Sequence, residues 1–158
     1  MSIDQSEFRR ILGHWVTGVA VVASCTEEGG PCGFTANAFT SLSLEPPLVL
    51  VCVDRAANSL AGIRETGRFT VNLLGSGDER LARHFATDAG DKFEGVAWTT
   101  AVTGAPVLAD ALAWVDCRVT IEVPGGDHVI FIGEVLGGDA DEGEPLIFYR
   151  GGYCRFMP

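Results

Sequence analysis

The sequence predicts a mainly β protein whose antiparallel strands close into a barrel with a few short helices at its flank. Three observations predict it. Short runs rich in β-branched residues recur along the chain, Gly- and Pro-rich turns separate them, and only two or three short amphipathic helices interrupt them. The chain has 158 residues with 47% hydrophobic composition, which suits one domain spanning residues 1–158 with a single buried core.

The N-terminal half begins with a predicted helix, capped by Asp4 or Ser6, whose apolar residues recur at helical spacing. These residues, which form one apolar helical face, are Phe8, Ile11, Leu12 and Trp15. The period then changes to that of strands. Strand-like or extended segments follow, in order, at 17–23, 33–40 and 48–53, with turn signals at 28–31 and 45–47.

The remaining elements alternate in the same way. Short helices are predicted at 58–66 and at 78–85, the second capped by Asp78. Strands are predicted at 69–74, 111–123, 128–136 and 146–149, and the glycine-rich turn at 124–127 makes the third of these the hairpin partner of the second. We see no repeat, linker or low-complexity segment.

Charge and cysteine content exclude several classes of protein. The net charge is −10, and Arg9-Arg10 is the only adjacent basic pair, so no nucleic-acid-binding patch is expected. The longest apolar run is too short for a membrane span, and the first ten residues do not look like a signal peptide. An odd set of five cysteines without C-x-x-C spacing predicts mostly buried free thiols and a cytoplasmic protein.

The sequence offers little for a metal, a nucleophile or a dinucleotide fold. The three histidines are far apart, no cysteine has a local base, and no G-x-S-x-G motif occurs, so no metal site or hydrolase is expected. The turn at Gly75-Ser76-Gly77 lies between a strand and a helix, but Arg80 stands where a dinucleotide fingerprint needs its third glycine. It is interpreted as a polar turn.

Three polar segments are the candidates for ligand binding. Residues 33–47 are rich in small hydroxyl and amide side chains, which would let a planar polar ligand approach the backbone closely, although a strand and a serine-rich turn would have the same composition. A polar cluster lies where a strand ends and a helix begins, and it predicts either a phosphate site or an ordinary Asn or Ser cap. Its members are Asp54, Arg55, Asn58 and Ser59. The turn Gly125-Gly126-Asp127-His128 carries a histidine, or is simply a good hairpin turn.

Taken in order, these segments resemble the short-chain flavin reductases, which have the FMN-binding split-barrel fold, an antiparallel Greek-key split β-barrel. The resemblance covers almost the whole chain. It rests on the segments at 17–22, 33–54, 69–72, 85–86, 91–93, 126–128, 132–135 and 145–146 and on Tyr153. It implies a homodimer that binds FMN or FAD, oxidises NADH or NADPH, and passes reduced flavin to a separate monooxygenase.

The resemblance also implies roles for individual residues. His128 would meet the nicotinamide nucleotide and is the catalytic candidate. Thr35, Ala36 and Asn37 would contact the isoalloxazine, Ser41 and Ser43 with the intervening Leu42 the ribityl or phosphate region, and Ser59 with Arg55 the phosphate. The remaining implied contacts are the lining residues Cys52, Val53 and Asp54 and the aromatic candidates Phe85, Phe93, Phe148 and Tyr149.

The leading function is therefore an NAD(P)H:flavin oxidoreductase that serves a two-component monooxygenase. Flavin would carry the hydride chemistry, so the protein would need to bind, orient and stabilise it. The alternatives are a flavin-binding split-barrel protein without nicotinamide turnover, and a barrel that binds a different ligand. The turn at 126–128 favours the first, because a pure flavin binder has no evident use for it.

Overall fold

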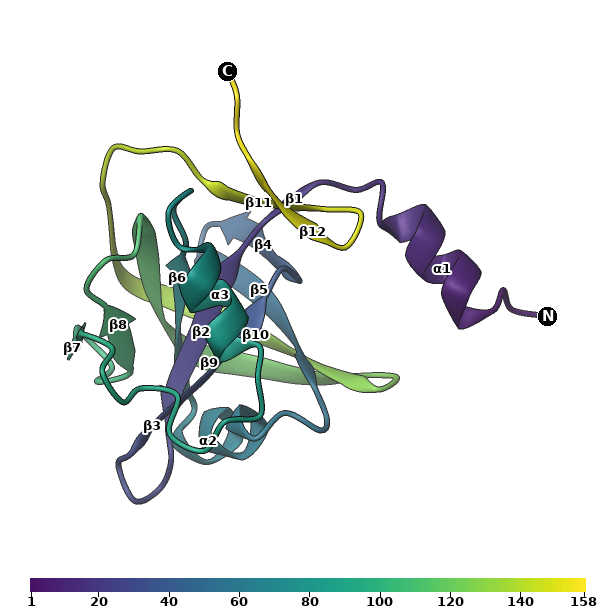
Figure 1. Cartoon of the computed structure of the whole chain (residues 1–158). Helices are drawn as coiled ribbons and strands as arrows, with labels where there is room; N and C mark the ends of the chain where they lie inside the picture. Colours follow the sequence, from purple (N-terminus) through teal and green to yellow (C-terminus); the bar gives the residue numbers. More distant parts are fainter.

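The computed structural model describes all residues, 1–158, and shows the predicted mainly β, antiparallel architecture (Figure 1). Three short helices accompany the strands: α1 (Gln5–Leu12), α2 (Ser59–Thr66) and α3 (Glu79–Phe85). The strands are β1 (Thr17–Gly18), β2 (Ala20–Cys25), β3 (Pro31–Ala36), β4 (Phe39–Leu44), β5 (Pro47–Asp54), β6 (Arg68–Leu73), β7 (Trp98–Thr100), β8 (Pro106–Leu108), β9 (Ala113–Gly125), β10 (His128–Ala140), β11 (Leu146–Tyr149) and β12 (Gly152–Arg155).

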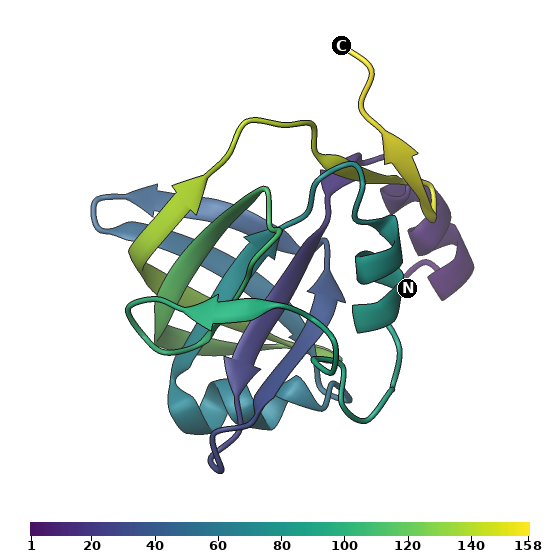
Figure 2. The same ribbon diagram turned by 60° about the vertical axis from the view of Figure 1, so that its left-hand side comes forward.

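Seven strands form the barrel in the order β3-β2-β6-β9-β10-β5-β4, and every pairing is antiparallel (Figure 2). The predicted segment at 33–40 is split into β3 and β4 at Asn37–Ala38, so its two halves lie at opposite ends of the sheet. The chain passes from β3 into β4 at Ala38, whose carbonyl accepts the Cys52 amide at 3.0 Å and so extends the β4–β5 ladder by one pair. The edge of β3 that faces away from β2 has no strand partner.

Two apolar clusters fill the two faces of β2. Because side chains alternate along a strand, Ala20 and Val22 enter the barrel interior with Val51 and Phe69, whereas Val21 packs on the outside. The outer cluster consists of Val19, Val21, Ala23, Leu74, Ala82, Phe85, Phe93, Leu108, Ala111 and Leu146. Helix α3 and strand β8 therefore cover one wall of the barrel, and β2 is buried on both faces.

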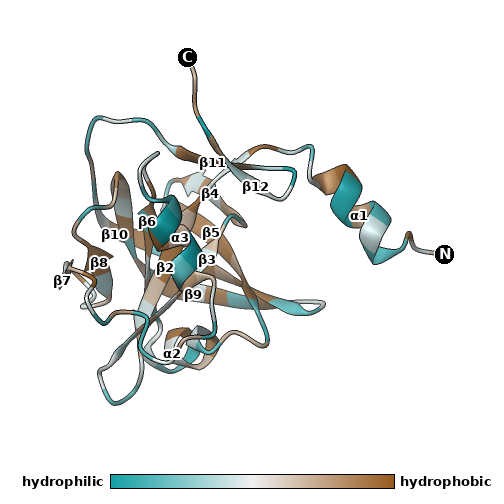
Figure 3. Ribbon diagram, viewed as in Figure 1, coloured by the Kyte–Doolittle hydropathy of each residue, from teal (hydrophilic) through white to brown (hydrophobic).

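The first helix forms where predicted, but its apolar face is not buried. Asp4 caps it by accepting the Glu7 amide at 2.9 Å. Figures 1 and 3 show α1 standing away from the barrel, with apolar colour along part of its surface. Phe8, Ile11 and Leu12 are exposed, and Trp15, which lies beyond the helix end, is 74% exposed. The spacing predicted the helix correctly, and its apolar face is uncovered within this single chain.

Other differences are local. Asp78 precedes α3 but accepts the Gly75 amide instead of capping the helix. The short strands β7, β8 and β12 were not predicted, and β10 runs four residues beyond its expected end. No helix is long and apolar enough to cross a membrane.

Candidate functional site

Two cavities lie along β3, one at each end of the strand, and we refer to them together as the β3 groove. The cavity beside the end of the strand has a volume of about 180 Å³ and contains Thr35, Ala36 and Asn37 in its lining. The cavity beside its start is smaller, about 50 Å³, and contains Pro31, Cys32 and Gly33. Residues between 86 and 93 line both cavities: Ala86 the first, and Ala89, Gly90, Lys92 and Phe93 the second. The segment after α3 is thus the opposite wall of one groove.

Lys92, the only lysine of the chain, lies in this groove at the start of β3. Its ammonium Nζ donates to the Phe85 carbonyl at 3.1 Å and to the Gly33 carbonyl at 3.2 Å, which fixes it between the two walls. Partial burial lowers the pKa of this ammonium, and the carboxylate of Asp88 opposes that shift. An ammonium held this way has a third N–H to offer an anion.

The N-terminus of α2 lies at the same end of the groove. Asn58, the N-cap residue, lines the cavity with Lys92, and its side chain makes no capping hydrogen bond. Amide groups without intrahelical partners at a helix N-terminus suit an anion, although the Leu60 amide here already donates to the Ala57 carbonyl at 3.1 Å. Ser59 is 3% exposed and lies beside the Cys32 thiol, whose pKa is raised by burial and lowered in part by the Ser59 hydroxyl. A cation and a helix N-terminus thus meet at one point.

The outer face of β5 and β10 carries a second group of predicted residues. Asp54 pairs with His128, and Cys52 pairs with Ile130, so these four side chains share one face. Burial raises the pKa of the Cys52 thiol. Val53 points the other way and is fully buried, so only its backbone is open to a ligand. The bond from Cys52 to Ala38 joins this face to the end of the β3 groove.

His128 begins β10, at the end of the turn that follows β9. Its Nδ1 lies 2.7 Å from Asp127 Oδ1, and this hydrogen bond lowers the pKa of the Asp127 carboxyl. Both side chains are solvent-accessible. With Nδ1 carrying the proton for Asp127, the imidazole presents Nε2 outward. The Arg55 side chain also reaches this turn, where its Nε donates to the Gly126 carbonyl at 2.9 Å.

The serine-rich segment is divided between two faces of β4. Ser41 pairs with Val49, whose side chain points into the barrel, and Ser43 pairs with Leu48, on the opposite face. The bulge at Leu42 causes the change, and the Leu42 side chain is exposed. Neither serine nor Leu42 lines the β3 groove, so the structure does not bring them together with Lys92 and Asn58.

The aromatic candidates divide as well. Phe85 is fully buried and Phe93 is 5% exposed; their rings pack edge-to-face with centroids 5.0 Å apart in the outer core cluster. Phe85 offers no open ring face within the chain, whereas Phe93 borders the smaller cavity, and both stay proposed members of the aromatic wall. Tyr149 points away, toward His14, whereas Phe148 and Tyr153 line the cavity at Asn37. The Thr35 hydroxyl is already used, since it donates to the Ala82 carbonyl.

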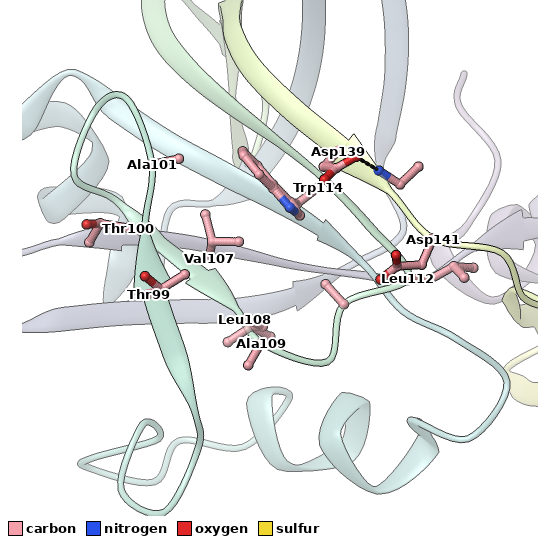
Figure 4. A pocket seen from close by; sticks show the side chains of 12 residues that line it. Thr99, Thr100, Ala101, Val107, Leu108, Ala109, Leu112, Trp114, Asp139 and Asp141 are labelled. Atoms are coloured by element: carbon pink, nitrogen blue, oxygen red, sulfur yellow. Dashed lines mark hydrogen bonds between the residues drawn. The ribbon is translucent and has the colours of Figure 1, made fainter.

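A larger cavity, about 370 Å³, adjoins the end of the groove because Val19, Ala36 and Asn37 line both. Its other walls are mostly apolar and include Trp15 and Phe39. A separate cavity of about 150 Å³ lies between the β7–β8 hairpin and the ends of β9 and β10 (Figure 4). Trp114, Asp139 and Asp141 border it, and none of the predicted site residues does.

Lys92 and Ala86 had no role in the sequence-based prediction, whereas Asn58 belonged to the predicted cluster at the start of the second helix. Lys92 and Ala86 occur in segments quoted for the resemblance, and Lys92 is conspicuous as the single lysine. What the sequence could not show is that residues 86–93 lie across from β3. That placement depends on α3 packing against the outer face of the barrel.

Comparisons with known proteins agree on one family. Residues 12–157 match the model of the flavin reductase like domain. The reductase component of a 4-nitrophenol 4-monooxygenase/4-nitrocatechol 2-monooxygenase from Rhodococcus opacus is 43% identical over 99% of this chain and 83% of its own. A flavin reductase (NADH) from Kitasatospora aureofaciens is 38% identical, with 98% and 83% covered.

Solved structures lead to the same result. The NADH:FAD oxidoreductase SgcE6 from Streptomyces globisporus, in complex with NAD and FAD fragments, superposes with a TM-score of 0.92. It is 40% identical, and the match covers 98% of this chain and 94% of that one. Nitrilotriacetate monooxygenase component B from Mycobacterium thermoresistibile gives a TM-score of 0.93 at 39% identity, covering 98% and 88%.

Proposed function

The chain belongs to the flavin reductase-like domain family, and we propose that it reduces FMN or FAD with a hydride from NADH or NADPH. Relatives named as reductase components of monooxygenases further support a role in supplying reduced flavin to a partner monooxygenase. The observation that carries the proposal is the groove along β3, which has an anion site at one end and an exposed backbone edge at the other.

The groove fits a flavin mononucleotide unit. Lys92 and the N-terminus of α2 suit its phosphate. From Gly33 to Asn37 the strand rises roughly 13 Å, at about 3.3 Å per residue, which leaves room for a ribityl chain. At the far end Ala36 adds no bulk, and the unpaired edge of β3 offers backbone donors and acceptors to a planar polar ring.

The residues of the β5–β10 face then serve the nicotinamide nucleotide. Bound flavin supplies the hydride acceptor, so the chain's part is binding, orientation and electrostatics. His128 directs its imidazole outward from the sheet, and Asp127 holds the ring in place. Orienting the two reactants is the main kinetic contribution that such a site makes. Ser41, Leu42 and Ser43 lie at the border of this face and remain proposed flavin contacts.

We also propose that the protein is a homodimer. Within one chain the apolar side chains of α1 are exposed, as are Leu42 and Leu44 on the edge strand β4. Exposed apolar surface of this extent, together with the uncovered β4 edge, is typical of a protein interface. Light scattering on the protein as it elutes from a size-exclusion column should give twice the mass of the 16.7 kDa chain. A mass equal to that of one chain would contradict the dimer.

Two further expectations complete the proposal. We propose that residues 1–158 act as one flavin reductase-like domain, because the two core clusters share β2 and the family match spans most of the chain. All five cysteines are free thiols, which suits a reducing compartment, and we propose the cytoplasm. We expect neither nucleic acid nor a membrane as partner, given the net charge of −10.

The test is the loss of NADH and NADPH absorbance by the purified protein, with and without added FMN or FAD. Nucleotide oxidation that depends on added flavin supports the proposal. A protein that retains bound flavin but oxidises neither nucleotide would instead be the flavin binder without turnover. A protein that binds no flavin at all would be a barrel for a different ligand.

A further inference from the structure

Arg55, the first residue after β5, makes both of its described hydrogen bonds to one turn. Its backbone amide donates to the Asp127 carbonyl at 3.0 Å. Its side-chain Nε donates to the Gly126 carbonyl at 2.9 Å. These are the two residues that connect β9 to β10, so a single arginine holds both peptide groups of the turn.

The position of Arg55 explains this geometry. The last rung of the β5–β10 ladder pairs Asp54 with His128, so the next residue along β5 faces the turn itself. Asp54 Oδ1 accepts the Ala56 amide and thereby bends the chain sharply after the strand. The bend leaves the guanidinium beside the turn, and the anion site at α2 is served by Lys92 and Asn58 instead.

The turn needs such support. Gly126 adopts φ +68°, a conformation that glycine enters easily and also leaves easily. Asp127 is 91% exposed at its side chain and packs against nothing that would order it except His128. A hairpin end with so little packing is ordered mainly by its hydrogen bonds, and Arg55 provides two from a neighbouring strand.

We propose that Arg55 is a positioning residue for the nicotinamide nucleotide, acting through the turn that carries His128, and that it is not a ligand of the flavin phosphate. This inference rests on the proposed function for its kinetic part. By fixing Gly126 and Asp127, Arg55 sets the backbone from which His128 projects. A preordered turn spares the nucleotide the entropic cost of ordering it on binding.

The experiment compares Arg55→Met, which keeps the aliphatic length but removes the donor, with Arg55→Lys, which restores a donor. Arg118→Met is the matched control, because Arg118 is an exposed arginine on β9 paired with Glu134 and distant from the turn. Three quantities are measured: the flavin Kd, KM and kcat for NADH, and the exchange rate of the residue 55 amide in flavin-free protein.

For Arg55→Met we expect KM for NADH to rise between about three- and tenfold, as for the loss of one hydrogen bond to a charged donor. The flavin Kd should change by less than about twofold, and the residue 55 amide should exchange about tenfold faster. In Arg55→Lys, KM for NADH and the amide exchange rate should return most of the way to the values of the unmodified protein. Arg118→Met should change neither quantity.

A raised flavin Kd with unchanged KM for NADH would overturn the inference and make Arg55 a phosphate ligand. Unchanged amide exchange in Arg55→Met would overturn it as well, since the turn would then be ordered without Arg55. If the unmodified protein oxidises neither nucleotide, the proposed function fails, and the exchange measurement still decides whether Arg55 holds the turn.

Discussion

Two sets of polar side chains lie on opposite sides of β2, and they differ in how completely they are hydrogen-bonded. One set, Thr70, Asn72 and Asp116, is fully buried behind the β7–β8 hairpin. The other set lies in the groove along β3 and at the His128 turn, and consists of half-buried or exposed groups such as Lys92 and Asn58. The sequence alone distinguishes the two sets poorly, because both contain small polar residues near strands.

Each side chain of the buried set is hydrogen-bonded within the protein. The Asn72 side chain donates to the Val21 carbonyl at 3.1 Å and to Thr70 Oγ1 at 3.0 Å, and it accepts the Leu108 amide at 2.8 Å. Thr70 donates to the Pro106 carbonyl. Asp116 accepts both the amide and the hydroxyl of Thr103. These bonds fasten β8 and the loop before it to the barrel wall.

The groove set is incomplete within the chain. The Asn58 side chain makes no capping bond, Lys92 has an N–H to spare, and His128 presents one ring nitrogen to solvent. Buried polar groups that satisfy one another order a structure, whereas polar groups that converge on a cavity and stay unsatisfied are suited to a ligand. The difference predicts that mutations in the two sets affect different measurements.

The largest effect is expected in the buried set. Asn72→Ala should lower the free energy of unfolding by about 3 kcal/mol, because it leaves the Leu108 amide buried without a partner, removes the side-chain bonds to Val21 and Thr70, and opens a small void. Urea unfolding measures the change. The remaining folded protein should bind flavin with nearly the affinity of the unmodified chain, because Asn72 is fully buried and lines neither cavity of the groove.

The control is Thr99→Ala on β7, an exposed hydroxyl of the same hairpin, which should change the unfolding free energy by less than about 0.5 kcal/mol. Equal destabilisation by the two substitutions would contradict the role given to the network. A loss of flavin affinity in folded Asn72→Ala, with little loss of stability, would contradict the separation of the two sets.

The second-largest effect is expected in the alkylation rates of the cysteines, because one of them is buried beside Asp116 and another is exposed. Cys117 is fully buried, and burial together with the neighbouring Asp116 raises its pKa to about 12, whereas Cys154 is exposed. Because the raised pKa leaves the thiol protonated below it, on the order of 10⁻⁴ of Cys117 is thiolate at pH 8. Iodoacetamide should therefore modify Cys154 at least a hundredfold faster, as followed by peptide mass spectrometry.

Measuring the same alkylation rates in Asn72→Ala tests whether Cys117 reacts only after global unfolding. If Cys117 reacts only through global unfolding, the loss of about 3 kcal/mol should speed its modification by about a hundredfold. The rate at Cys154 should stay the same. Rapid modification of Cys117 in the unmodified protein at pH 8 would show that the wall between β6 and β9 opens locally.

How far the sequence predicts this molecule depends on the range of the interaction. Runs such as 48–53 become strands because alternation and turns are local properties, and β5 is found almost as expected. The face of α1 was predicted equally well by its spacing, but a spacing cannot say whether a partner covers it. The three-residue strand β8 is fixed because Asn72 and Thr70 bind its backbone, and β7 pairs with β8; no local sequence pattern indicates either contact.

The site follows the same rule. Ala36 and Asn37 are where a backbone-lined slot was expected, because that expectation came from residue types in one segment. Arg55 was expected at the phosphate because it precedes a helix, but the bend after Asp54 directs its side chain to Gly126. Lys92 is 34 residues after Asn58 in the chain and meets it only because α3 packs on the barrel.

The third effect tests Lys92. Lys92→Met should weaken FMN binding by roughly tenfold or more, through the loss of a charge-assisted bond to phosphate. Riboflavin, which has no phosphate, should lose less than about threefold. The comparison between the two flavins is needed because Lys92 also joins the Gly33 and Phe85 carbonyls, so the substitution loosens the groove for any ligand. Equal losses for both flavins, measured by fluorescence titration, would assign Lys92 a structural role only.

The smallest effect is expected at Asn58, which shares its residue type with Asn72 but makes no capping bond. Asn58→Ala should leave the urea midpoint almost unchanged, because the side chain has no hydrogen bond to lose. It should raise the FMN Kd by about threefold, as expected for one neutral hydrogen bond to the ligand. The side-chain amide of asparagine is therefore expected to contribute to stability at position 72 and to FMN binding at position 58. A drop of 1 kcal/mol or more in the stability of Asn58→Ala, with FMN binding unchanged, would reverse that assignment and make Asn58 an ordinary helix cap.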